Sequence, residues 1–129
     1  MVGIVVVSHS FDLAKDIKKL CKEIASNAHI AAAGGTEDGR FGTDVKRIID
    51  AINEVYSEDG VIIIFDMGSA YNSAEMAVDC IDECKKDKIE IIDTAFVEGS
   101  LTAAVEAGIG KNIDEIKRIL NTMCLNKMP

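Results

Sequence analysis

The chain has 129 residues, 48% of them hydrophobic, which suits a single compact domain spanning residues 1–129. The formal net charge is −8 and no basic stripe interrupts the acidic residues, so we expect no nucleic-acid partner. No apolar stretch approaches the roughly 20 residues of a membrane span, and the first residues lack the features of a secretory signal. We therefore expect a cytoplasmic protein that has no membrane partner.

The sequence alternates short aliphatic runs with amphipathic segments. Aliphatic runs of four to six residues are typical of buried strands, whereas apolar residues spaced three and four apart indicate helices. In chain order we predict a strand at 2–7, a helix at 13–24, a strand at 29–33, a helix at 45–55, a strand at 61–65, a helix at 74–81, a strand at 89–92 that 94–97 extends, and helices at 99–108 and 112–125. The last helix has Asn112 as its expected N-cap.

This alternation predicts a single doubly wound α/β domain. Strands that are aliphatic along their whole length are buried on both faces, as in a mainly parallel sheet with helices on both sides. We expect the strand order 2-1-3-4. In such sheets ligands bind beyond the carboxyl ends of the strands, where the strand order reverses.

The residues with side chains suited to chemistry fall in the loops at that edge. Ser8-His9-Ser10 follows the first strand, and Asp66 to Ala70 follows the third. The second strand leads into two turns, Gly34-Gly35-Thr36 and Gly42-Thr43-Asp44, and Glu98-Gly99-Ser100 follows the fourth. We therefore expect these loops to form one site.

His9 is the candidate nucleophile. It immediately precedes a helix that starts near Ser10 or Asp12, so its ring lies beside unpaired backbone N–H groups that attract anions. A neutral imidazole there has a ring nitrogen free to attack phosphorus. Asp66, at the end of the neighbouring strand, would accept the N–H of the other ring nitrogen and orient His9.

The loops also contain groups that could bind a phosphoryl group. Backbone N–H groups at glycines and side-chain hydroxyls are suitable donors, and the candidates are Ser8, Ser10, Gly35, Thr43, Gly68 and Ser69. The chain has no lysine-bearing phosphate loop and no clustered carboxylates for magnesium. We therefore predict neither a nucleotide hydrolase nor a cofactor.

Each of these residues also has a purely structural interpretation. A lone histidine at a strand end is often a hydrogen-bonded structural residue, Asp66 could cap the helix that follows it, and Gly34-Gly35 could be turn residues. His29 has no evident partner, and we interpret it as structural.

The cysteines do not indicate a disulfide framework. We assign each of the four to a helical segment, with Cys84 just beyond the apolar positions at 74–81, and a reducing compartment keeps thiols free. Cys80 and Cys84 have a spacing that could bind zinc, but no second Cys or His pair lies nearby. We expect them to be small residues packed beneath a helix and predict no metal site.

Four segments resemble one known family over essentially the whole chain. The segments "VVVSHSFDLA", "AAAGG" with the later "GTD", "DMGSAYNSAE" and "VEGSLTAAVEA" are similar to the phosphotransferase subunits of dihydroxyacetone kinases that depend on the phosphoenolpyruvate phosphotransferase system. These subunits are similar in fold to enzyme IIA domains of the mannose transporter family. The chain has Asp16 where relatives commonly have glycine, which leaves the detail of the first helix open.

The resemblance implies a phosphohistidine carrier, and with it an enzyme subunit acting in glycerol metabolism. His9 would accept a phosphoryl group from the phosphocarrier HPr and pass it to ADP on the nucleotide-binding subunit of the kinase, which then phosphorylates dihydroxyacetone on a third subunit. It also implies a homodimer, and, since the chain ends at Pro129, the single-domain form served by a separate HPr. Two alternatives remain: a transporter component that donates to a IIB domain, and a non-catalytic anion-binding regulatory module.

Overall fold

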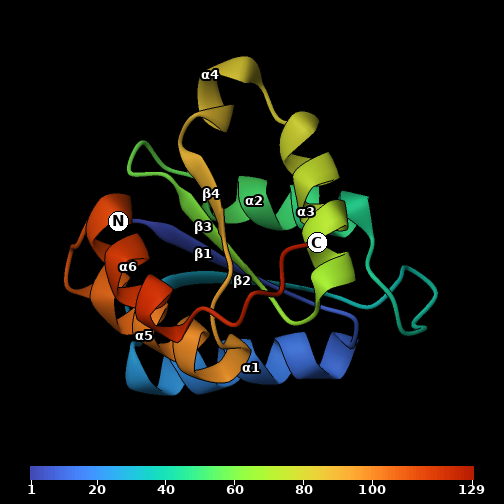
Figure 1. Ribbon diagram of the computed structural model, residues 1–129, viewed down its shortest axis with the longest axis horizontal. Coiled ribbons are helices and arrows are strands. Elements are labelled where there is room, and N and C mark those ends of the chain that lie inside the picture. Colours follow the sequence, from blue (N-terminus) through green and yellow to red (C-terminus); the bar gives the residue numbers. More distant parts are fainter.

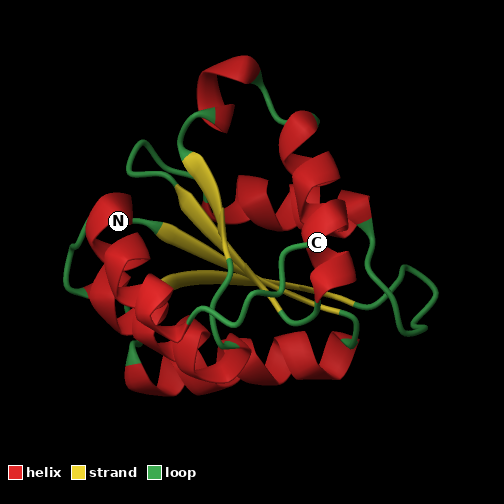
Figure 2. Cartoon of the chain, viewed as in Figure 1, coloured by secondary structure: helices red, strands yellow, loops and turns green.

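Four parallel strands form the sheet at the centre of the computed structural model, which describes residues 1–129 (Figures 1 and 2). They are β1 (Gly3–Ser8), β2 (His29–Gly34), β3 (Val61–Phe65) and β4 (Ile89–Ile92), in the order β2-β1-β3-β4. The α/β class, the single domain and the 2-1-3-4 order are therefore confirmed. No helix is long and apolar enough to cross a bilayer.

Helices cover both faces of the sheet (Figure 1). On one face α1 (Phe11–Ile24), α5 (Phe96–Gly108) and α6 (Ile113–Leu120) pack on Ile4, Val6, Ile62 and Ile64. On the other, α2 (Val45–Val55) and α3 (Gly68–Asp79) pack on the intervening strand residues. Alternate strand side chains point to opposite faces, so strands this aliphatic fit only a sheet that is covered twice. A short α4 (Glu83–Lys86) precedes β4, and a 3-10 turn (Asn121–Met123) follows α6.

The prediction that residues 94–97 extend the fourth strand is wrong. The pairing of β4 with β3 ends at Ile64 and Ile92, and β3 itself ends at Phe65, so the backbone beyond has no strand to pair with. Instead, the hydroxyl of Thr94 donates to the carbonyl of Leu120 and the N–H of Ala95 to the carbonyl of Met123. Ala95 is the N-cap of α5, which therefore begins at Phe96, three residues before the predicted start at 99.

The helix predicted at 45–55 is confirmed as α2 (Val45–Val55), but the boundaries of two later helices differ from the prediction. Asn112 is the N-cap of α6 and forms a capping box with Glu115, as its position indicates, but the helix ends at Leu120 rather than 125. The helix predicted at 74–81 begins at Gly68, since small and polar residues of its first turns gave no apolar periodicity.

The cysteines differ from expectation in their surroundings. All four are free; Cys80 is the C-cap of α3 and Cys124 follows the 3-10 turn, so neither lies within a helix. Cys80 and Cys84 are exposed rather than packed beneath a helix. Cys21 is buried, and burial raises the pKa of its thiol to about 11. No group of three or more His, Cys, Asp or Glu side chains could hold a metal ion.

The strand register brings the ends of the two central strands and β2 to one level. Val7 pairs with Phe65, and Ser8 pairs with Gly34. The residues that immediately follow, His9, Gly35 and Asp66, therefore leave the sheet side by side at its carboxyl edge.

Candidate functional site

The backbone around His9 is fixed on both sides. Ser10 is the N-cap of α1, and its hydroxyl accepts a hydrogen bond from the N–H of Leu13 at 3.2 Å. The carbonyl of His9 accepts from the N–H of Gly42 at 2.8 Å, which ties it to the loop after β2. His9 therefore has an ordered backbone, while its side chain remains 21% exposed at the edge of the sheet.

Asp66 organises this edge through both carboxylate oxygens. One oxygen contacts the Nδ1 of His9 at 2.9 Å and accepts the N–H of Met67 at 2.7 Å. The other accepts the hydroxyl of Ser8 at 2.9 Å and the N–H of His9 at 3.0 Å. Burial by itself would raise the pKa of Asp66, but these hydrogen bonds together outweigh it and hold the pKa below its usual value. Asp66 is therefore an ionised carboxylate at neutral pH.

This carboxylate decides which nitrogen of His9 carries the proton. An ionised carboxylate can only accept hydrogen bonds, so Nδ1 must be the donor, and Nε2 of the neutral ring holds the free electron pair. The Nε2 atom lies 2.7 Å from the Oγ of Ser69. Ser69 therefore donates its hydroxyl to Nε2 and marks the direction from which an electrophile would approach.

Ser69 belongs to the first turn of α3. The N-cap of this helix is Met67, which makes no side-chain capping bond, so Asp66 does not occupy the capping position that was its structural alternative. The first N–H groups of a helix lack intrahelical partners and carry its positive dipole end. The free electron pair of His9 thus faces a helix terminus suited to a negatively charged group.

The remaining candidates for phosphate binding lie around His9 and Ser69 and do not contact Nε2 of His9. Ser8 is fully buried, and its hydroxyl both donates to Asp66 and accepts the N–H of Ser10 at 3.0 Å, so it supports the carboxylate from behind. Ser10 caps α1, as described above. Thr43 shares a 2.6 Å hydrogen bond with Ser73 of α3.

The glycines among these residues are needed for the backbone conformation and close packing. A Cβ at Gly34 would lie 2.4 Å from the carbonyl oxygen of Ser10, and Gly35 has a φ of +69° and donates its N–H to the carbonyl of Ser8. Gly68 is the first residue of α3. The structure thus brings His9, Asp66, Ser8, Gly68 and Ser69 together, with Ser10, Gly35 and Thr43 in the surrounding loops. His29 lies exposed at the start of β2, away from this edge.

Two residues at the same edge were missed from the sequence. Asp93 directly follows β4 and is buried, with 7% exposure. Its carboxylate accepts the N–H groups of Leu125, Lys127 and Met128. The position of Asp93 after a strand would have identified it, had residues 94–97 not been assigned to that strand. Lys127 lies in a short tail of mixed apolar and polar residues that carries no periodic signal.

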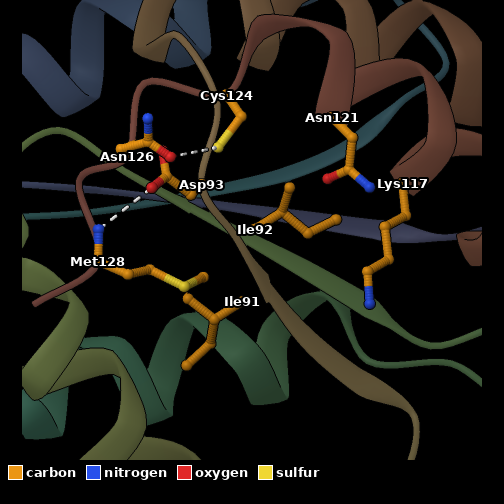
Figure 3. Close-up of a pocket in the computed structure, with 8 residues that line it drawn as sticks. All are labelled: Ile91, Ile92, Asp93, Lys117, Asn121, Cys124, Asn126 and Met128. Carbon is orange, nitrogen blue, oxygen red and sulfur yellow. Dashed lines mark hydrogen bonds between the residues drawn. The ribbon is translucent and has the colours of Figure 1, made fainter.

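A pocket of about 350 Å³ opens beside β4 (Figure 3). Its lining consists of Ile91, Ile92, Asp93, Lys117, Asn121, Cys124, Asn126 and Met128. None of the residues that contact His9 lines it, so it is separate from the nucleophile.

Comparison with known proteins gives a consistent result. The family model described as "PTS system fructose IIA component" matches residues 3–117. The chain is 36% identical to the phosphotransferase subunit DhaM of a dihydroxyacetone kinase from Lactococcus lactis, covering 97% of this chain and 98% of the relative. It is 38% identical to a phosphoryl donor subunit DhaM from Pantoea ananatis, of which it spans only 25%.

Solved structures share the fold. A protein of unknown function, EF1359, matches with a TM-score of 0.85 and 34% identity over 95% of this chain and 94% of that one. The mannose/sorbose-specific IIA subunit of Enterococcus faecalis matches with a TM-score of 0.56 at 20% identity over 95% of this chain and 88% of that one, a likeness of fold alone.

Proposed function

The chain belongs to the family of PTS system fructose IIA components, and we propose that it carries a phosphoryl group on Nε2 of His9. The observation that carries this proposal is the pair of hydrogen bonds on the imidazole. Asp66 engages Nδ1, and Ser69 contacts Nε2 at the first turn of α3. One ring nitrogen is thus fixed as a donor and the other kept as a nucleophile.

The transfer step needs no group beyond these side chains and the donor. The electron pair of Nε2 attacks phosphorus, a P–N bond forms, and the bond from phosphorus to the donor breaks, with its electron pair leaving on the donor atom. The ring becomes positively charged while Nδ1 keeps its proton, and the Asp66 carboxylate stabilises that charge. Ser69, released from Nε2, can turn its hydroxyl to a phosphoryl oxygen, and the first N–H groups of α3 stabilise the same oxygens.

We assign HPr as the donor and ADP held on the nucleotide-binding subunit of dihydroxyacetone kinase as the acceptor. The identity of 36% to the Lactococcus subunit over nearly the full length of both chains supports this assignment. The site itself adds support, because it has no phosphate-binding loop with a lysine and no metal cluster. An acceptor nucleotide must therefore be presented by another protein.

The acceptor is tested by mixing the ³²P-labelled chain with candidate acceptors. We expect the label to persist with ADP alone and to be lost rapidly once the ADP-loaded nucleotide-binding subunit is added. Transfer to a mannose-type IIB protein and not to that subunit would establish the transporter alternative instead. If phosphoenolpyruvate, enzyme I and HPr put no label on the chain at all, the non-catalytic anion-binding regulatory alternative is favoured.

We also propose that the chain forms a homodimer. Strand β4 pairs only with β3, so its outer edge has unpaired backbone groups, and Ile91 is partly exposed there. Pairing with a second copy would satisfy both. Sedimentation equilibrium at micromolar concentration should give twice the mass of 13.9 kDa, and the monomer mass at that concentration would refute the proposal.

A further inference from the structure

The C-terminal segment, residues 124–128, crosses the carboxyl edge of the sheet from α6 towards α3 (Figure 1). It forms no helix or strand, and its backbone is held by Asp93, which accepts the N–H groups of three of its residues. A nearly buried carboxylate with three backbone donors is a strong anchor, since leaving such a charge unpaired is costly. The segment therefore has a defined path across this edge.

The anchored segment brings one cation to the end of β3. The Nζ of Lys127 donates to the carbonyl oxygen of Phe65 at 2.7 Å and lies 4.7 Å from the centre of the Phe65 ring. Phe65 immediately precedes Asp66. The carbonyl oxygen of Lys127 also lies against α3, only 2.7 Å from where a Cβ at Gly68 would be. Lys127 therefore touches residues on both sides of the Asp66-Met67 turn.

The charges around Lys127 agree with this placement. Burial lowers the pKa of Lys127, and the carboxylates of Asp93 and Asp66 oppose that effect. No lysine or arginine pairs with, or hydrogen-bonds to, Ser8, His9, Asp66 or Ser69, so these four residues comprise one carboxylate and neutral groups. The ammonium group of Lys127, held at the neighbouring carbonyl of Phe65, is the cation that acts on Asp66.

A phosphoryl group on His9 would add about two negative charges beside that carboxylate. Like charges this close oppose each other, and a fixed cation nearby reduces the cost of bringing them together. We propose that Lys127, anchored by Asp93, is a positioning residue that offsets the charge of Asp66 and the incoming phosphoryl group during transfer. This inference rests on the proposed function and deepens it.

The test compares Lys127→Met, which keeps the long side chain and removes the charge, with Lys127→Arg, which keeps the charge. Each variant is labelled with two donors, phosphorylated HPr and phosphoramidate, a small compound that phosphorylates histidine without a protein partner. We expect Lys127→Met to slow labelling about tenfold with both donors, because Lys127 contacts Phe65 and not Asp66 itself, so its charge acts on the site from a distance. Lys127→Arg should stay within about threefold of wild type. Lys117→Met, which removes a lysine paired with Glu90, is the matched control and should label at the wild-type rate.

Asp93→Ala tests the anchor. By itself it should slow labelling as Lys127→Met does, and combined with Lys127→Met it should add little, because both changes remove the same placed charge. Circular dichroism and thermal melts verify that each variant is folded.

Wild-type labelling rates in Lys127→Met, equally slow labelling in Lys127→Arg, or independent effects of the two substitutions would overturn the inference. If phosphoramidate labels the wild type and HPr does not, the assignment of the donor fails, while the phosphoramidate rates still decide the role of Lys127.

Discussion

Replacement of His9 by alanine should abolish phosphorylation by phosphoenolpyruvate, enzyme I and HPr. His9 is the only group at the carboxyl edge whose nucleophilic atom is both exposed and oriented by a carboxylate, so nothing else there can form the P–N bond. Incorporation of ³²P should fall to background, which is a larger effect than any other single substitution at this site would cause.

The matched control is His29→Ala. His29 lies exposed at the start of β2, at the opposite end of that strand from the site, and its removal should leave labelling unchanged. If His9→Ala takes up label normally while His29→Ala does not, the assignment of the nucleophile is wrong.

Replacement of Asp66 by asparagine should slow phosphoryl transfer at least about a hundredfold. The carboxylate accepts hydrogen bonds on both oxygens, whereas an amide offers one acceptor and one donor group. If the NH₂ group faces Nδ1, it favours the tautomer that places the proton on Nε2, and a comparable exchange in a catalytic triad costs about 10⁴ in rate. The measurement is the rate of labelling by phosphorylated HPr in rapid-quench experiments.

The control for loss of one negative charge is Asp50→Asn, which removes a surface carboxylate that pairs with Lys46 on α2. It should transfer at the wild-type rate, and circular dichroism should show both variants folded. Wild-type transfer in Asp66→Asn would mean that Asp66 only supports the turn after β3.

The lowered pKa of Asp66 also leads to a prediction of how the stability of the fold depends on pH. Its pKa is lower in the folded state than the ordinary value of 3.8, so its ionised form stabilises the fold above that value. That contribution is lost as the pH falls through the lowered folded pKa. Chemical denaturation should therefore show a smaller loss of stability between pH 5 and roughly 2 in Asp66→Asn than in wild type.

The sequence was sufficient to predict the sheet and the main pair of the site. Strands such as Val61–Phe65 are aliphatic throughout, which fits only a sheet covered on both faces, and the polar residues then collect at one edge by topology. His9 and Asp66 are the residues that directly follow two neighbouring strands, so their proximity could be predicted from strand order alone.

What could not be predicted depends on contacts between distant segments. Residues 94–97 have the composition of a strand, yet the side-chain hydroxyl of Thr94 bonds to Leu120 and the backbone N–H of Ala95 bonds to Met123, over twenty-five residues away. The same applies to Ser8, whose hydroxyl is directed at Asp66 rather than at a ligand. Lys127 contacts Phe65 from a tail whose N–H groups Asp93 accepts, and no local sequence pattern encodes either contact.

The central claim is that phosphorus becomes bonded to Nε2 of His9, because Asp66 occupies Nδ1. The most direct test is NMR of the ¹⁵N-labelled chain after phosphorylation by HPr, in which ³¹P coupling to the ring identifies the bonded nitrogen. We predict a single phosphohistidine with phosphorus on Nε2 and the proton retained on Nδ1. Phosphorus on Nδ1, or on any residue other than His9, would contradict the account.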